Sequence, residues 1–130
     1  MPLHADVPAQ VQAFLAEPRR LLIGGSWVPS HSGESFASVN PSTGQVIAQL
    51  AHGGAHDIDA AVQAARQAFE GGWPRTKPAE RQRLLLALAD LVERHYEELA
   101  WLQALDFGGP ISAMRAGRAR PVGLLRYYAG

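Results

Sequence analysis

Cysteine is absent from all 130 residues. The chain therefore has no disulfide framework, no thiolate ligand for a metal and no thiol nucleophile of its own. Net charge is also absent, since twelve basic residues balance twelve acidic ones, and this argues against binding to nucleic acid or to an anionic membrane. No apolar run reaches the roughly 18 residues of a membrane span, and no basic segment followed by an apolar core opens the chain. We therefore expect a cytoplasmic protein.

The composition is that of a folded domain, with 47% hydrophobic and 18% charged residues. Residues 1–20 carry a short amphipathic helical pattern and are interpreted as an N-terminal arm. Next, two β-prone runs at residues 21–23 and 26–28 flank the pair Gly24-Gly25. A two-residue glycine link between such runs predicts a tight β-hairpin.

A second strand pair is predicted at residues 35–39 and 45–51. The turn between them contains Pro41, which fixes one backbone angle, and Gly44, which can supply a positive φ. In the second strand of this pair the side chains alternate. One face is expected to be packed and the other mixed, with Val46, Ala48 and Leu50 on one and Gln45, Ile47 and Gln49 on the other.

Helical periodicity takes over after the second hairpin. Residues 57–69 form a first apolar stripe, and residues 76–109 are expected to form one long uninterrupted helix. A third helical segment begins at Ile111 and is expected to break or kink at Pro121.

The apolar faces of these three helices exceed what two hairpins can cover. Leu88 and Leu91, in the long helix, are expected to face a surface that these residues cannot supply. We therefore expect an α/β chain that is the truncated beginning of something larger.

Two polar clusters are candidate sites. His52 and His56 have the i, i+4 spacing of a helical metal site, but two glycines between them place the pair in a connection, so we assign no metal there. Arg115, Arg118 and Arg120 could meet phosphate or a carboxylate. The preferred interpretation is that they are solvated arginines on the outer side of a helix.

Several short motifs together resemble one family. Residues 22–28 read LIGGSWV, residues 39–47 read VNPSTGQVI, residues 105–110 read LDFGGP, and residues 125–130 read LRYYAG. In this order and spacing they resemble the NAD(P)-dependent aldehyde dehydrogenases, and the helical pattern at 57–69 is similar to the first helix of that family.

The resemblance implies that residues 21–130 are a partial, truncated coenzyme-binding domain of Rossmann type. It would contain two short β-hairpins followed by three helices, with the main parallel sheet absent from this chain. In the family the catalytic cysteine, the general base and the groups that hold the coenzyme all lie downstream, so no catalytic or coenzyme-binding residue is assigned here. The fragment alone is expected to be inactive.

For the full-length parent the resemblance implies oxidation of an aldehyde to a carboxylic acid with NAD or NADP, through a cysteine thiohemiacetal and hydride transfer. A homo-oligomer, dimer or tetramer, is implied as well. Two peripheral sites are implied on this chain: a monovalent cation at Val39 and Asp106, and the wall of the substrate tunnel at Ala116 and Arg120. Asp106 is equally well interpreted as a helix-end residue making turn hydrogen bonds.

Two other functions stay open. A truncated, non-catalytic protein would act by association with a partner or a full-length subunit through its exposed helix faces. A small nucleic-acid binder using the arginines of residues 115–126 is disfavoured by the zero net charge.

Overall fold

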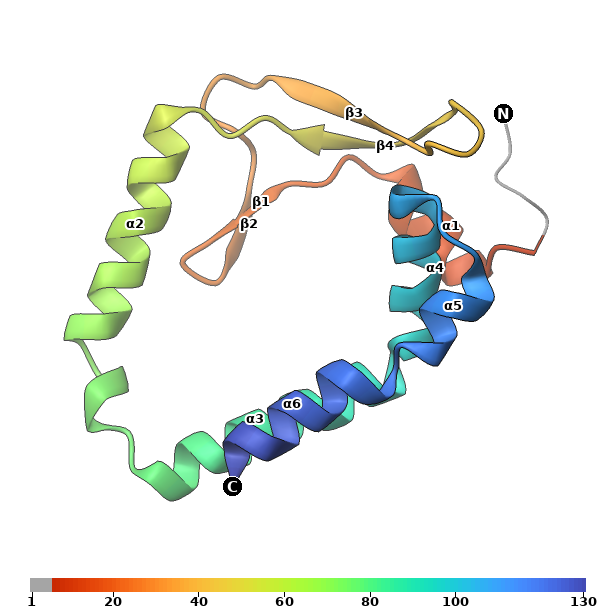
Figure 1. Ribbon diagram of the computed structural model, residues 1–130. Helices are drawn as coiled ribbons and strands as arrows, with labels where there is room; N and C mark the ends of the chain where they lie inside the picture. Colours follow the sequence, from red (N-terminus) through yellow and green to blue (C-terminus); the bar gives the residue numbers. More distant parts are fainter. Residues whose placement is uncertain (1–5) are drawn as a thin grey trace.

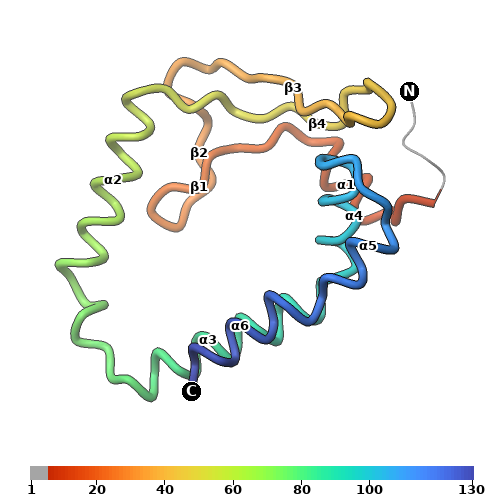
Figure 2. Tube along the Cα trace, in the orientation of Figure 1, coloured from red at the N-terminus to blue at the C-terminus, as the bar shows by residue number. Residues whose placement is uncertain are grey.

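The computed structural model describes residues 6–130 as short elements arranged around an open frame (Figure 1). Residues 1–5 of the expected N-terminal arm lie outside the described residues. The tube in Figure 2 shows the same path, in which α6 returns alongside α3. None of the helices in residues 6–130 is long and apolar enough to cross a membrane.

The elements are, in chain order, α1 (Ala9–Ala16), β1 (Leu21–Ile23), β2 (Ser26–Val28), β3 (Ser35–Val39), β4 (Val46–Ala51), α2 (Ala55–Glu70), the 3-10 turn η1 (Trp73–Arg75), α3 (Pro78–Arg94), α4 (Tyr96–Phe107), α5 (Ile111–Ala116) and α6 (Ala119–Ala129).

The first hairpin is confirmed. β1 and β2 pair antiparallel, with Leu22 opposite Trp27. Gly24 and Gly25 both have positive φ, 58° and 81°, as a two-residue type I′ turn requires. A Cβ built on Gly24 would lie 3.8 Å from the Cβ of Ala64, so the tip of this hairpin rests on α2.

The second hairpin is also confirmed, but its expected alternation is wrong. Ser38 lies opposite Ala48 while the next residue, Val39, lies opposite Val46. Ile47 is therefore the extra residue of a β-bulge, and a bulge re-aims the side chains of its strand. As a result Ile47 and Ala48 are both buried and Val46 is 56% exposed.

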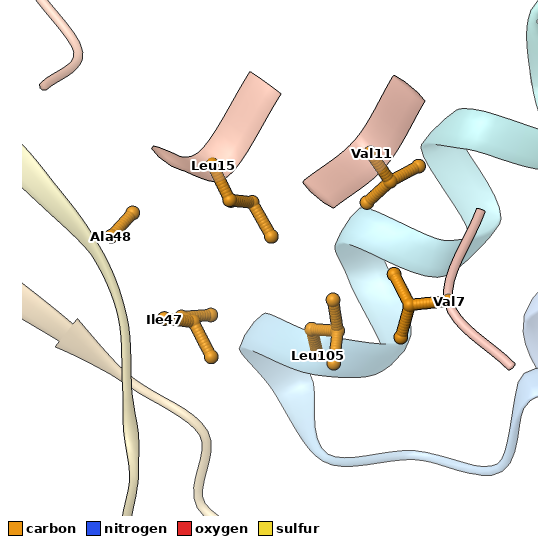
Figure 3. Close-up of a cluster of buried hydrophobic side chains, with 6 residues drawn as sticks. All are labelled: Val7, Val11, Leu15, Ile47, Ala48 and Leu105. Carbon is orange, nitrogen blue, oxygen red and sulfur yellow. The ribbon is translucent and has the colours of Figure 1, made fainter. Parts of the chain in front are cut away.

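The main core lies where the N-terminal segment, β4 and α4 meet (Figure 3). The segment also adds an edge to the second hairpin, because the Arg19 N–H donates to the Gln49 carbonyl and the Arg19 carbonyl accepts from Ala51, both at 2.8 Å. Residues 7–20 are thus packed against the rest of the chain. The side chains of this core are Val7, Val11, Leu15, Ile47, Ala48 and Leu105.

The expected single helix over residues 76–109 is wrong. α3 ends at Arg94 and α4 begins at Tyr96; His95 between them has φ −98° and ψ 13°, and the two helices run in different directions (Figure 1). No proline or glycine marks the break. Tyr96 is buried and its hydroxyl donates to the Met114 carbonyl at 3.0 Å, a contact between segments far apart in sequence that overrides local helix preference.

The third helical segment is also divided, but not by Pro121. The helical path is interrupted at residues 117–118, between α5 and α6. Pro121 lies in the first turn of α6, where a missing N–H removes no helix hydrogen bond. The expectation of a break at Pro121 is therefore wrong.

Two helices leave their large apolar stripes exposed. Ile58, Val62 and Phe69 on α2 are 58%, 53% and 71% exposed. On α3, Leu88 and Leu91 are 46% and 48% exposed, as expected for side chains that the described residues leave uncovered.

Candidate functional site

The best-defined polar junction joins the β3–β4 turn to the end of α4. The Ser38 hydroxyl donates to Asp106 Oδ1 at 2.9 Å, and the Ser42 hydroxyl donates to the Gly108 carbonyl at 3.1 Å. Gly108 ends α4 in the left-handed conformation, with φ 79°. A Cβ there would lie 2.6 Å from Cγ of Pro41, so glycine allows the turn to approach this helix end.

This junction brings together the two residues expected to hold a cation. Val39 ends β3 immediately after Ser38, whose hydroxyl contacts Asp106. Both Val39 and Asp106 are exposed. Carboxylate, hydroxyl and backbone oxygens are the donors that hard cations accept. Asp106 does lie in the last turn of α4, as its alternative interpretation expects, but the hydrogen bond that its carboxylate accepts comes from Ser38 in β3.

The two expected tunnel residues lie on either side of the α5–α6 link. Ala116 is the last residue of α5 and Arg120 lies in the first turn of α6, and both are exposed. Within residues 6–130, no ion pair or side-chain hydrogen bond engages Arg120, whereas the neighbouring Arg118 reaches Glu93 at 3.1 Å.

Most arginines of residues 115–126 are paired with acids rather than free. Arg115 forms a two-pronged contact with Glu97, whose Oε1 also accepts the Trp101 indole N–H at 3.0 Å. The Arg115 hydrogen bond holds the pKa of Glu97 below its usual range, and Glu97 in turn raises the pKa of Arg115. Arg126 bonds to Asp90 and Glu93. The interpretation of Arg115, Arg118 and Arg120 as solvated side chains is therefore only partly right: all three are exposed, but Arg115 and Arg118 are engaged with acids.

Asp57 forms a buried polar centre that the sequence pattern did not single out. Its side chain is aimed at two backbone groups, with Oδ1 accepting from His31 N–H and Oδ2 from Gly54 N–H, both at 2.9 Å. The hydrogen bond from Gly54 is the main reason that the pKa of Asp57 lies below its usual value. An aspartate at the third position of a helix was the available signal.

The histidines do not converge on one metal. His52 lies 3.5 Å from Glu34, while His56 stacks on His31 with ring centroids 3.9 Å apart. Among the described residues there is no group of three or more side chains that could hold a metal ion.

A groove among residues 6–130 lies elsewhere. It has a volume of about 670 Å³ and opens between residues 17–20, β2 and the start of β3, with Trp27, Arg20 and Glu34 on its walls. None of the four expected site residues lines it.

Comparison with known proteins identifies the family. The model of the aldehyde dehydrogenase family matches residues 27–130. The chain belongs to this family. It is 50% identical over 113 residues to the mitochondrial aldehyde dehydrogenase family 2 member B4 of Arabidopsis thaliana, covering 85% of this chain and 21% of that protein. It is 44% identical to the putative aldehyde dehydrogenase DhaS of Bacillus subtilis (strain 168), covering 98% of this chain and 26% of that protein.

The fold also matches a fragment of a solved aldehyde dehydrogenase. The NAD+ complex of the Bacillus cereus enzyme superposes with a TM-score of 0.92 at 44% identity, covering 96% of this chain and 26% of that one. The chain thus spans about a quarter of the length of the relatives it matches. The open frame of Figure 1 therefore superposes on about a quarter of that solved chain.

Proposed function

We propose that residues 21–130 are the N-terminal part of the coenzyme-binding domain of an NAD(P)-dependent aldehyde dehydrogenase, preceded by an arm at residues 1–20. The observation that carries this proposal is the fold match to an NAD+ complex of which the chain covers only 26%. The exposed stripes of α2 and α3 support it, because helices of this kind require a partner surface.

In the parent enzyme, a cysteine outside these residues adds to the aldehyde carbonyl carbon, and water then hydrolyses the acyl thioester to release the carboxylic acid. Bound NAD or NADP would supply the acceptor for the hydride that leaves the substrate carbon between these two steps. The residues of this chain help to position the groups of the parent enzyme and form no bond to the substrate, since none of them is a cysteine. The fragment alone is therefore inactive and binds no coenzyme, while the parent acts as a homo-oligomer in the cytoplasm.

Two peripheral roles are part of the proposal. Val39 and Asp106 contribute oxygen ligands to a monovalent cation, supported by the hydrogen bond that joins their two elements. Ala116 and Arg120 line the approach of the substrate. Arg120 has no acidic partner within residues 6–130, which leaves its guanidinium available for a negatively charged aldehyde.

A chimera tests the proposal. These 130 residues replace the matching segment of the Bacillus cereus aldehyde dehydrogenase, and the product is assayed for NAD+ reduction with a neutral and a carboxylate-bearing aldehyde. We expect activity from the chimera and none from the 130-residue chain. Micromolar NAD+ binding by the isolated chain in calorimetry, or a folded chimera that binds NAD+ but has no activity, would contradict the assignment.

Two variants of this chimera test the peripheral roles. Arg120→Ala should raise KM for the carboxylate-bearing aldehyde on the order of tenfold, the size of one lost charged hydrogen bond, and leave the neutral aldehyde unchanged. Asp106→Ala should abolish the gain in thermal stability that added K⁺ or Na⁺ gives the unsubstituted chimera. An equal effect of Arg120→Ala on both aldehydes, or a cation response that Asp106→Ala leaves intact, would remove the corresponding role.

A second candidate function is association without catalysis. The exposed large side chains of α2 and α3 favour it, because contiguous apolar surface promotes binding to a partner or to a full-length subunit. In the enzyme proposal the remaining residues of the parent cover these stripes, whereas in the association proposal a partner or a full-length subunit covers them.

A further inference from the structure

One face of α3 and α4 carries an acidic stripe. Asp90, Glu93 and Glu97 follow one another at helical spacing, and Trp101 continues the row one turn later. Asp90 and Glu93 lie on α3, while Glu97 and Trp101 lie on α4 beyond the break at His95. Each of these four side chains takes part in a hydrogen bond, so the stripe is an ordered polar surface.

The arginines that meet this stripe all come from α5, α6 and the link between them. Arg115 reaches Glu97 with two nitrogens, and its guanidinium carbon lies 5.8 Å from the centre of the Trp101 ring. Arg118 and Arg126 share Glu93, one on each carboxylate oxygen, at 3.1 and 2.7 Å. Charge complementarity therefore joins residues 90–97 of α3 and α4 to both helices of the C-terminal segment and to the link between them.

The apolar part of the same contact is thin. α5 has no buried residue, and α6 has only Val122 and Ala129. On α3 the one buried side chain is Ala89. On α4, Tyr96 is buried and its hydroxyl donates to the Met114 carbonyl of α5 at 3.0 Å. Beyond this anchor the contact has few fully buried side chains, which contribute little burial energy, so we assign much of the register of α6 along α3 to the ion pairs.

We propose that α5 and α6 form one detachable hairpin that docks on α3 and α4 through an arginine latch, defined as Arg115, Arg118 and Arg126 on the acidic stripe. The latch sets the position of the hairpin along α3, and its release lets the hairpin move as a unit about residues 108–110. This inference rests on the contacts alone and does not depend on the proposed enzyme activity.

Release of the latch has two structural consequences. It uncovers Ala89, the buried side chain of α3, and the half-buried Leu85 and Val92 beside it. It also displaces residues 116–120, which the hairpin carries between its two helices. The other ion pairs of the described residues join groups close in sequence, except His52 with Glu34, so salt should act mainly on this hairpin.

Hydrogen exchange of the 130-residue chain, followed by mass spectrometry, tests the latch. Raising NaCl from about 0.05 to about 0.5 M should speed exchange of residues 111–129 on the order of threefold to tenfold, because screening weakens several exposed ion pairs together. Residues 9–16 and 46–51, which form the core, should change little. Equal acceleration in both regions, or none in residues 111–129, would overturn the proposal.

A charge swap separates the latch from ordinary packing. Glu97→Arg should speed exchange of residues 111–129 as high salt does, and adding Arg115→Glu to it should restore most of the protection. Arg66→Glu is the matched control, because Arg66 pairs within α2 at 3.6 Å from Glu70; it should leave residues 111–129 unchanged. If residues 111–129 exchange as fast in the double variant as in Glu97→Arg, the proposal that charge pairing holds the hairpin is refuted. If Glu97→Arg does not fold, the salt series on the unsubstituted chain tests the proposal instead.

Discussion

Asp57 shows how one side chain fixes the relation between two elements. Its carboxylate accepts hydrogen bonds from Gly54, which precedes α2, and from His31, in the loop after β2. The residue is only 6% exposed, and the nearby rings of His31 and His56 add positive charge whenever they are protonated. Both hydrogen bonds require the ionised carboxylate to act as acceptor with both of its oxygens.

This arrangement makes stability depend on pH. Because the folded pKa of Asp57 is depressed, its contribution is present above the unfolded pKa of about 3.9 and is lost as pH falls through the lower folded value. Asp57→Asn should therefore have a lower melting temperature than the unsubstituted chain at pH 7. Between about pH 5 and about pH 3, its melting temperature should fall less than that of the unsubstituted chain. Asp59→Asn, at an exposed position two residues on, is the control for thermal melts. Parallel pH curves for the Asp57 variant and the unsubstituted chain would contradict this role.

Gly108 carries a second residue-level prediction. Its φ of 79° disfavours a side chain, and a Cβ would lie 2.6 Å from the Pro41 ring and 3.0 Å from the Ser42 hydroxyl. Gly108→Ala should cost about 1–3 kcal/mol of unfolding free energy. Gly123→Ala is the matched change, since a Cβ at Gly123 inside α6 meets nothing within 4 Å; it should stabilise by about 0.5–1 kcal/mol. Urea unfolding of both variants measures the difference. Equal changes in unfolding free energy would show that the β3–β4 turn moves to accommodate the added methyl group at position 108.

At the scale of elements, the sequence predicts what local chemistry determines. Glycine pairs, proline and β-prone runs located both hairpins, because their turns depend on backbone preferences of a few residues. The break at His95 could not be predicted in this way. It is associated with the contact of Tyr96 with Met114, 18 residues away, and no periodic pattern encodes such a partner.

The candidate site follows the same division. Val39 and Asp106 could be named from motifs, yet the hydrogen bond between Ser38 and Asp106 spans 68 residues of sequence. Likewise, the arginines at 115, 118 and 126 could be recognised as a basic cluster, whereas their acidic partners on α3 and α4 could not. The sequence thus predicts which residue types are available for a site. Which of them pair across different helices and strands becomes known only from the folded structure.

At the scale of the whole molecule, the chain is an open frame with apolar stripes turned to solvent. The buried set is limited: Val11 is the largest fully buried side chain among residues 6–130, while Phe69 is 71% exposed. Relatives in this family are about four times longer, as the 26% coverage indicates. The proposed parent would cover these stripes with its own remaining residues, and an isolated chain has only other copies or a partner to do so.

Self-association of the 130-residue chain follows from this exposure, and sedimentation velocity over a concentration series measures it. Val62→Lys or Leu88→Lys should weaken association on the order of tenfold each, because each removes one large apolar side chain from the contact. Both positions are about half exposed in the monomer, 53% and 46%, so the folded chain tolerates lysine there. Gln63→Lys, at an exposed polar position of α2, should change nothing. A chain that stays monomeric at every concentration would contradict the prediction. In the chimera the same two substitutions should instead lower the melting temperature, because there the stripes are covered within one polypeptide.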